Sequence, residues 1–126
     1  MFEYQPKFSI IVPTYNTPIP FLREMIDSVV AQTYPNWELC IGDGSEGNPE
    51  LEQVLAEYAA KDTRIKYQIL EKNFGIAGNT NGALELATGE YVGLFDHDDI
   101  LGPNALFVSK QKTLLERKSN DILYYG

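Results

Sequence analysis

The feature that most constrains the fold is a regular alternation of short apolar runs with longer amphipathic segments. The apolar runs are rich in β-branched and aromatic residues, as buried strands are, and turn-forming residues separate them from the next segment. Strands that alternate with helices favour a parallel sheet covered on both faces. The sequence therefore predicts an α/β, Rossmann-like fold of three α/β/α layers with a mostly parallel sheet, its strands at residues 8–12, 37–41, 65–70, 91–95 and 121–125.

The segments between these strands carry apolar side chains at helical spacing, which predicts helices that pack one face on the sheet. Pro13 is expected to stop the first strand, Gly89 to end the third helix and Pro103 to open the fourth. The residues expected to face inward are Leu22, Ile26, Val29 and Val30, then Leu51, Val54, Leu55, Tyr58 and Ala59, then Ile76, Thr80, Ala83, Leu84 and Ala87, and finally Phe107, Leu114 and Leu115.

Three carboxylates, Asp96, Asp98 and Asp99, follow the predicted strand at 91–95 directly. Like charges packed this closely are unfavourable unless a cation lies between them. Ligands of α/β proteins bind at the carboxyl ends of the strands. We therefore expect Asp96 and Asp98 to hold one divalent cation, which in turn holds an anionic group. A solvated loop or a helix cap is the competing interpretation, although the next helix begins near Pro103, several residues too late for Asp96 to cap it naturally.

The loops after the other strands bring further polar groups to the same edge of the sheet. Tyr15 could stack on a base, and Asp43 could accept a hydrogen bond from a base N–H or a ribose hydroxyl. With a metal to grip a diphosphate, this set suits a nucleotide diphosphate that carries a group for transfer. Plainer interpretations stay open: Tyr15 could pack against the sheet, Asp43 could order its own glycine-rich turn, and Asn73 is typical of a turn.

Composition and missing motifs exclude several classes of protein. A formal net charge of −8 without a basic stripe argues against a nucleic-acid partner. Cys40 is the single cysteine, so no disulfide forms within the chain, as in a reducing compartment. No apolar run approaches the roughly 20 residues of a membrane span, and no signal-peptide pattern is present, so we expect a cytoplasmic protein. Neither a P-loop motif nor GxGxxG after the first strand occurs.

A series of motifs runs in order along essentially the whole chain: Phe8-Ser-Ile-Ile-Val-Pro-Thr-Tyr-Asn16, Gln32-Thr-Tyr-Pro-Asn-Trp-Glu-Leu39, Asn73-Phe-Gly-Ile-Ala77, Asn81, Ala87-Thr-Gly-Glu-Tyr-Val92 and Phe95-Asp-His-Asp-Asp99. This series resembles the family 2 glycosyltransferases, which are inverting enzymes of the GT-A fold. From this resemblance we expect residues 1–126 to form a single GT-A-like nucleotide-sugar-binding domain, the donor-binding half of such an enzyme.

The resemblance implies a nucleotide-diphosphate sugar as donor, most often a UDP-sugar, and a saccharide or lipid-linked acceptor. Asp96-His97-Asp98 matches the family's D-x-D motif, with Asp98 at the position that binds Mn²⁺ or Mg²⁺ and Asp96 nearer the ribose and sugar. Pro13 and Tyr15 match positions that line the nucleoside pocket, and Asp43 falls in the loop that contacts the base. Asn73 is a further candidate for donor binding. The full-length protein could work at the inner face of the membrane.

Two departures from the family's pattern bear on the site. The second loop usually has two adjacent acids before Gly-Ser, whereas Gly42-Asp43-Gly44-Ser45 has one, as if a residue were deleted. The family's catalytic base lies well downstream of the D-x-D motif, and here we expect it beyond Gly126. The chain then resembles a domain truncated at its C-terminal end, and the apolar surface exposed there would favour self-association.

Three other functions compete with donor binding and transfer. A phospho-receiver domain fits the length and the alternation, but it needs acids after the first strand, where Pro13-Thr14-Tyr15 stands. A nucleotidyltransferase also binds metal at a strand end, but it usually has a glycine-rich, basic loop in place of Thr14-Tyr15-Asn16. A family member that binds nucleotide sugars without catalysis is the third alternative, because one acid of the second loop is missing.

Overall fold

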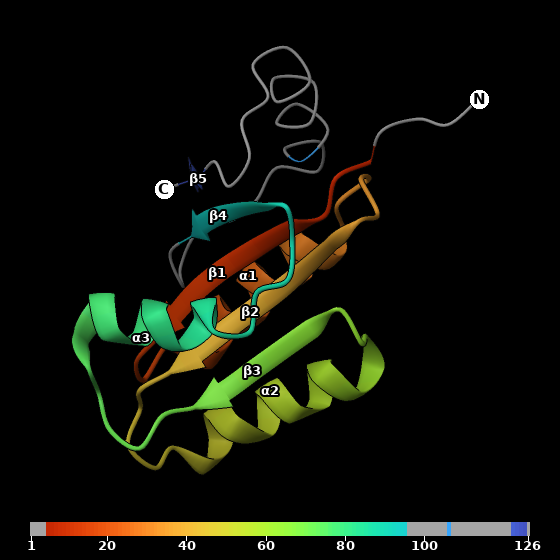
Figure 1. Cartoon of the computed structure of the whole chain (residues 1–126). Helices are drawn as coiled ribbons and strands as arrows, with labels where there is room; N and C mark the ends of the chain where they lie inside the picture. The colour runs from red at the N-terminus through yellow and green to blue at the C-terminus, as the bar shows by residue number, and fades with distance from the viewer. Residues whose placement is uncertain (1–4, 96–105, 107–121, 126) are drawn as a thin grey trace.

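The computed structural model describes residues 5–95, Leu106 and the backbone of 122–125. Its elements, in chain order, are β1 (Phe8–Thr14), α1 (Ile19–Val30), β2 (Trp37–Asp43), α2 (Pro49–Lys61), β3 (Ile65–Ile69), α3 (Gly75–Leu84), β4 (Tyr91–Phe95) and β5 (Ile122–Tyr125). The alternation of strands and helices that the sequence predicts is therefore present along the described part of the chain (Figure 1).

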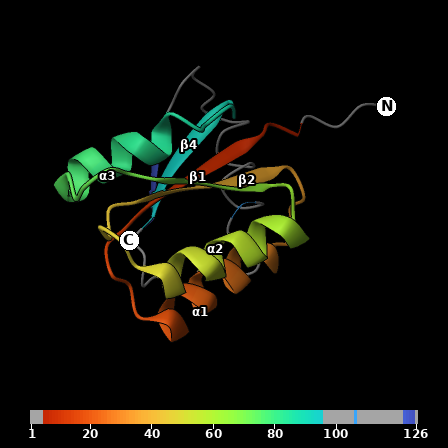
Figure 2. The same ribbon diagram turned by 90° about the horizontal axis from the view of Figure 1, so that it is seen from below.

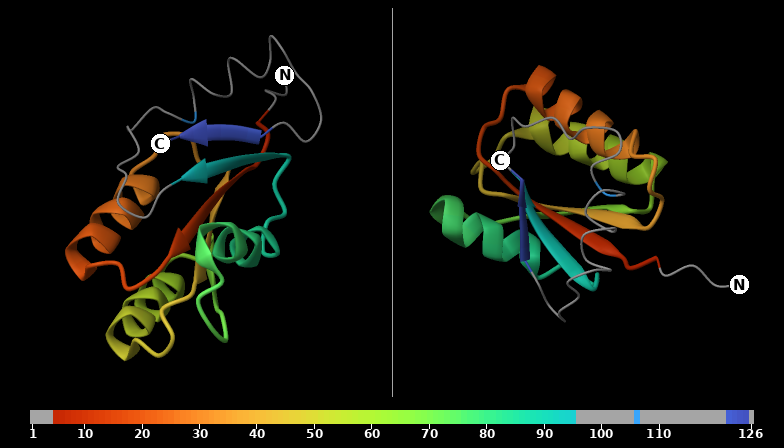
Figure 3. Two further views of the ribbon diagram at one scale, coloured as in Figure 1. Left: turned by 90° about the vertical axis from the view of Figure 1, so that its left-hand side faces the viewer. Right: turned by 90° about the horizontal axis from the view of Figure 1, so that it is seen from above.

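The strands form a single sheet in the order β3-β2-β1-β4-β5, and every neighbouring pair is parallel. The left panel of Figure 3 shows β4 and β5 continuing the sheet on the far side of β1 from β2. Consecutive strands run from β1 outward to β3, and the chain then returns to place β4 on the other side of β1. The order of the strands thus reverses between β1 and β4, which is where open α/β sheets bind ligands at their carboxyl edge.

Helices cover both faces of this sheet, so the predicted three-layer α/β/α fold is confirmed. Figure 2 shows α1 and α2 on one face and α3 on the other. The larger core lies under α1 and α2 and is built on Phe8, Ile10, Leu39 and Ile41, while Ile11, Cys40 and Ala83 form a smaller core under α3. Both faces of β1 and β2 are buried, which explains their nearly continuous apolar sequence.

The prediction that Pro13 stops the first strand is wrong, because β1 continues through it to Thr14. In a parallel strand the N–H and C=O of one residue point to the same neighbour, and alternate residues point to opposite sides. The carbonyl of Thr14 accepts from Gly44 N on the β2 side at 2.9 Å, so Pro13 faces β4. Pairing with β4 has already ended at Ile11 and Leu94, and the missing N–H of Pro13 therefore costs no sheet hydrogen bond.

The inward faces of α1 and α2 largely match the prediction. Leu22, Ile26 and Val29 of α1 are buried, together with Met25, but Val30 is 40% exposed and lies outside the stripe. In α2 the buried residues are Leu51, Val54 and Leu55. Asn48 caps α2 by accepting from Leu51 N at 3.2 Å, and Pro49 opens the helix at the position where its missing N–H does no harm.

The predicted inward face of α3 is correct for Ala83 and wrong for Ile76 and Leu84. Ile76 is 80% exposed and Leu84 is 42% exposed, whereas Asn79, Gly82 and Ala83 are buried. The cause is Gly42 of β2: a Cβ there would lie 2.2 Å from the carbonyl oxygen of Asn79 and 2.7 Å from the amide nitrogen of Ala83. The backbone of α3 rests directly on the sheet at this point, so small residues face inward and the large apolar ones turn to solvent.

Helix α3 also ends at Leu84, earlier than predicted, and Ala87 lies beyond it. The amides of Leu86 and Ala87 bond to carbonyls three residues back, at Ala83 and Leu84, so the chain leaves the helix through tightened turns. The predicted helix near Pro103 lies outside the described residues except for Leu106, which is helical and buried in the larger core. Among the helices that the structure describes, none is long and apolar enough to cross a membrane.

Candidate functional site at the carboxyl edge of the sheet

Asp43 ends β2 at the carboxyl edge and is 1% exposed. One carboxylate oxygen, Oδ1, accepts from the hydroxyl of Thr14 at 2.8 Å and from the hydroxyl of Ser45 at 2.5 Å. The other oxygen, Oδ2, has no hydrogen bond to any described residue. The predicted base contact is therefore held rigidly by the ends of two adjacent strands, with one oxygen still able to accept.

The loop after β1 is tied to the loop after β2. Asn16 donates from its backbone N–H to the Ser45 hydroxyl at 2.8 Å, and its side chain accepts from Asn48 at 3.1 Å. Asn16 has a φ of 46°, a left-handed conformation that asparagine tolerates better than most residues. Tyr15, held just before this turn, is 51% exposed. The ring of Tyr15 is thus not buried in either core, and Pro13, the other residue predicted to line the nucleoside pocket, is half-buried.

Asn73, predicted as a donor contact, is used mainly to build its own loop. Its Oδ1 accepts from Gly75 N at 3.0 Å and from the Asn79 side chain at 2.9 Å. Its backbone N–H donates to the Glu46 carboxylate at 2.9 Å, which joins this loop to the loop after β2. The Asn73 side-chain N–H₂ makes no hydrogen bond to the described residues, so only this donor is left for a ligand. The plainer interpretation as a turn former is correct for its carbonyl group.

The aspartates predicted to bind metal, Asp96 and Asp98, lie outside the described residues, as does their neighbour Asp99. The structure describes β4 up to Phe95, the residue directly before Asp96. Within the described part of the chain no group of three or more His, Cys, Asp or Glu side chains could hold a metal ion. The predicted cation therefore depends on Asp96 and Asp98 and stays a prediction.

The position directly before Asp43, where the family pattern has its other acid, holds Gly42 in this chain. Residues of β2 pair one for one with β1 and β3 through Gly42 and Asp43, without a gap or bulge. The residue before Asp43 is Gly42, where the backbone of α3 leaves no room for a Cβ. An acidic side chain at this position is incompatible with the observed distance between α3 and the sheet.

A second buried carboxylate, Glu38, lies at the opposite end of β2 and was not singled out from the sequence. It is 1% exposed and accepts from Ser9 at 2.6 Å, Lys66 at 2.7 Å and Lys7 at 3.1 Å. It also accepts from the backbone N–H of Thr88 at 2.5 Å and from its hydroxyl at 2.9 Å. A glutamate inside the apolar run 37–41 is the signal that could have revealed it.

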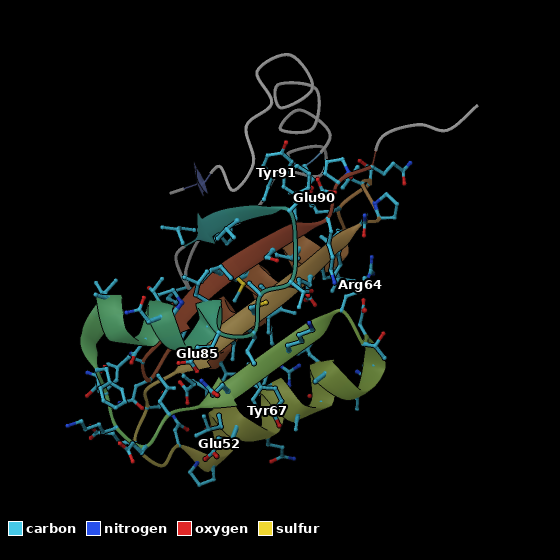
Figure 4. The ribbon with its side chains drawn as sticks, in the orientation of Figure 1. Glu52, Arg64, Tyr67, Glu85, Glu90 and Tyr91 are labelled. Atoms are coloured by element: carbon cyan, nitrogen blue, oxygen red, sulfur yellow. The ribbon has the colours of Figure 1, made fainter. Side chains whose placement is uncertain are left out.

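The electrostatics of Glu38 are those of a carboxylate kept charged. Burial by itself would raise the pKa of Glu38, but the hydrogen bonds from Lys66, Ser9, Thr88 and Lys7 outweigh it and hold the pKa well below its usual range. Nearby Cys40 shows the effect of burial without such donors, since burial first and then the Glu38 charge raise the pKa of its thiol to about 12. Figure 4 labels Arg64, Glu90 and Tyr91 toward this amino end of the strands.

Several known proteins are similar to this chain in sequence and in fold. The family model described as "Glycosyl transferase family 2" matches residues 9–125. The uncharacterized protein y4gI of Sinorhizobium fredii is 45% identical over 106 residues, which are 84% of this chain and 12% of that protein. Crystal structures of S. aureus TarS 1–349 with UDP (TM-score 0.76) and with UDP-GlcNAc (TM-score 0.70) are both 31% identical to this chain.

Another solved structure, of the mannosyltransferase PcManGT from Pyrobaculum calidifontis with GDP-Man and Mn²⁺, has a TM-score of 0.69 at 28% identity. The matches cover 86% of this chain and 32% of the UDP-bound TarS chain, and 89% of this chain and 33% of PcManGT. The chain therefore spans about a third or less of the proteins it matches here. Its sequence and its GT-A type of α/β fold both place it in glycosyl transferase family 2.

Proposed function

We propose that this chain is the donor-binding part of an inverting glycosyltransferase that transfers a sugar from a UDP-sugar to an acceptor hydroxyl. The observation that carries this proposal is the Asp43 carboxylate, which is buried at the ligand-binding edge of the sheet and has one oxygen free of hydrogen bonds within the described residues. A carboxylate oxygen that the protein leaves without a hydrogen bond is available to accept from a base N–H.

The single free oxygen favours uracil over guanine. Uracil presents one ring N–H between two carbonyl groups, whereas guanine presents an N–H and an adjacent amino group that suit a carboxylate with both oxygens available. In this chain Thr14 and Ser45 already occupy Oδ1. TarS, which is similar in fold, was crystallised with UDP and with UDP-GlcNAc, in agreement with this assignment.

The other donor-binding residues follow from their positions around Asp43. The half-exposed Tyr15 ring would stack on the base, with Pro13 beside it in the wall of the nucleoside pocket. The free side-chain N–H₂ of Asn73 would donate to an oxygen of the donor. The acceptor is a saccharide or a lipid-linked sugar. The base that deprotonates its hydroxyl is not assigned to any residue of this chain.

A divalent cation is part of the proposal. Asp98 would bind Mn²⁺ or Mg²⁺, and Asp96 would lie nearer the ribose and the sugar. Carboxylate oxygens suit either ion, and the ion supplies the Lewis acidity that stabilises a departing diphosphate. The presence of Mn²⁺ with GDP-Man in the similar PcManGT supports this choice. A net charge of −8 makes such a cation more necessary, because the chain as a whole repels a diphosphate.

Calorimetric titration of UDP into the chain, with and without Mn²⁺, tests the proposal. We expect binding that strengthens with Mn²⁺ in the wild type, and loss of the Mn²⁺-dependent part in Asp98→Ala. Asp62→Ala is the control, because Asp62 caps the end of α2 and pairs with Arg64 away from the site. Absence of UDP binding under both conditions would refute donor binding. Metal-dependent binding that prefers UTP to UDP would favour the nucleotidyltransferase alternative instead.

A further inference from the structure

The cluster around Glu38 connects four parts of the chain that are far apart in sequence. We define the Glu38 clamp as Ser9 of β1, Glu38 of β2, Lys66 of β3, and Lys7 and Thr88 from the segments that precede β1 and β4. All the donor–acceptor distances to the Glu38 carboxylate lie between 2.5 and 3.1 Å. One carboxylate thus accepts from every part of the cluster, and the two lysines balance its charge.

The clamp is attached directly to the start of β4. Thr88 donates both its N–H and its hydroxyl to Glu38, and the N–H of Gly89 donates to the Ser9 hydroxyl at 2.8 Å. The turn fits so closely that a Cβ at Gly89 would lie 2.5 Å from the Ser9 hydroxyl oxygen and 2.7 Å from the Lys7 carbonyl oxygen. Since β4 begins two residues later at Tyr91, its starting point against β1 is fixed.

The start of β4 is also held by the Lys7 carbonyl, which accepts from the backbone N–H groups of Glu90 at 2.8 Å and Tyr91 at 3.2 Å, but the apolar pattern of β4 itself specifies its register weakly. Its sequence Tyr-Val-Gly-Leu-Phe is apolar throughout, with Tyr91 and Phe95 in the larger core and Val92 and Leu94 packed on the smaller one. A slip by one residue would exchange apolar side chains for apolar side chains, so the hydrophobic pattern discriminates weakly between registers.

A polar contact with defined partners discriminates strongly, because a slip of β4 would take the N–H and the hydroxyl of Thr88 away from the buried Glu38 carboxylate. The donors on the other segments, Ser9, Lys7 and Lys66, would stay in place.

We propose that the Glu38 clamp is a positioning device for the donor site, because it fixes the register of β4 and thereby the place of the aspartates that follow Phe95. The inference rests on the proposed function for its consequence, since Asp96 is the first residue after β4. A slip by one residue would shift the end of β4 by about 3.3 Å along the strand and turn each side chain to the opposite face. A metal site tolerates neither change.

Hydrogen exchange of the backbone amides tests the effect on β4 without any ligand. We expect Glu38→Gln to raise the exchange of the Tyr91–Phe95 amides roughly tenfold or more relative to the β2 and β3 amides. Val54→Ala is the control: Val54 belongs to α2 and is buried in the larger core on the other face of the sheet, so its truncation lowers stability without touching the clamp. The same exchange pattern in both variants would overturn the proposal.

Thr88→Val provides a milder second variant in case Glu38→Gln does not fold. It removes one hydroxyl donor but keeps the carboxylate and both lysines, and a smaller rise confined to β4 is expected. If β4 exchange stays at the wild-type level in both folded variants, the clamp does not fix β4.

Ligand binding then tests the consequence for the site. In Glu38→Gln we expect the Mn²⁺-dependent part of UDP binding to weaken roughly tenfold, while uridine alone, which uses Asp43 and not the aspartates after β4, binds as in the wild type. Equal weakening of uridine and of UDP with Mn²⁺ would overturn the positioning role. If wild-type chain binds no UDP, the proposed function fails, and the exchange experiment still decides whether the clamp fixes β4.

Discussion

At the scale of single residues, β2 carries two buried carboxylates with different surroundings. Glu38 accepts on both of its oxygens, from Ser9, from Thr88 and from two lysines. Asp43, five positions later, accepts on one oxygen from two hydroxyls. A carboxylate that is saturated by the protein serves the fold, whereas one with an oxygen to spare is available to a ligand. This contrast separates the structural acid from the acid proposed to bind the base.

The first prediction concerns Asp43. Asp43→Asn keeps the size of the side chain, and its carbonyl oxygen can still accept from Thr14 and Ser45, but the free oxygen becomes an NH₂ group that faces the base N–H. We expect UDP affinity to fall roughly 10- to 100-fold, the usual worth of a hydrogen bond to a charged group. Calorimetry measures the loss, and circular dichroism checks that the variant is folded. Unchanged affinity would remove Asp43 from the site.

The second prediction concerns Glu38 and pH. Because the pKa of Glu38 is lowered in the folded state, its contribution to stability is complete above the unfolded-state pKa of about 4.3 and is lost as the pH falls below that value. At pH 7 we expect Glu38→Gln to cost about 2–4 kcal/mol, somewhat less than a fully enclosed ion pair, because both lysines reach solvent. Near pH 2 the difference between wild type and variant should shrink.

Urea unfolding at several pH values measures this difference. Glu57→Gln is the matched control: Glu57 pairs with Arg23 at 3.2 Å on the surface, and the pKa of Glu57 is also lowered, chiefly by its hydrogen bond from Arg23. Solvent screens that pair, so its removal should change stability little at any pH. A Glu38→Gln cost that does not depend on pH would contradict the assigned charge.

Sequence reasoning found one of these two acids and missed the other for a physical reason. Asp43 stands among glycines at the end of an apolar run, a pattern that indicates a loop and a ligand. The partners of Glu38 are 28 to 50 residues away in sequence, and only the pairing of β1 with β2 and β4 and of β2 with β3 brings them together. The spacing of acids along a chain carries no information about such contacts.

At the scale of elements, α3 shows how the sheet selects the face of a helix. Its apolar stripe predicts that Ile76 and Leu84 face inward, yet the helix approaches β2 so closely that only Asn79, Gly82 and Ala83 fit. Hydrophobic periodicity finds a helix reliably, but it cannot tell how near the helix lies to the sheet. That distance depends on Gly42, a residue of another element.

The third prediction follows from this close contact. Gly42→Ala places a methyl group 2.2 Å from the Asn79 carbonyl, so α3 has to move, and we expect a loss of about 1–3 kcal/mol. Ile76→Ala, on the predicted inward face but 80% exposed, should change stability by less than about 0.5 kcal/mol. Chemical denaturation of the two variants compares them directly. A larger loss for Ile76→Ala than for Gly42→Ala would mean that the helix faces the other way.

At the scale of the whole molecule, the order of the strands determines where the candidate residues meet. Segments far apart in the chain end side by side at the reversal between β1 and β4: Thr14 ends β1, Asp43 ends β2, and Phe95 ends β4 just before the aspartates. The alternation of strands and helices predicts the parallel sheet. The strand order, and with it this meeting point, came from the structure.

The fourth prediction concerns the stability of the entire chain in the presence of its donor. A ligand that binds only the folded state at 100 times its Kd adds about 2.7 kcal/mol. For 126 residues, a typical unfolding entropy converts this to a rise in Tm on the order of 10 °C. Differential scanning fluorimetry with UDP and Mn²⁺ measures it. UDP alone and Mn²⁺ alone should each give a smaller rise, and an equal rise with Mn²⁺ alone would point to a metal site without a nucleotide.

The direct packing of the α3 backbone on Gly42 has a consequence for the engineering of this protein. A variant library that restores a second acid before Asp43 has to vary the helix in the same molecules, because Asn79 and Ala83 occupy the space that the new side chain requires. The side chain of Asn79 also lies against Gly44 and holds the loop of Asn73, so lifting α3 would loosen two loops of the donor site together. We therefore expect an acid at position 42 to be accommodated only when positions 79 and 83 are changed in the same variant.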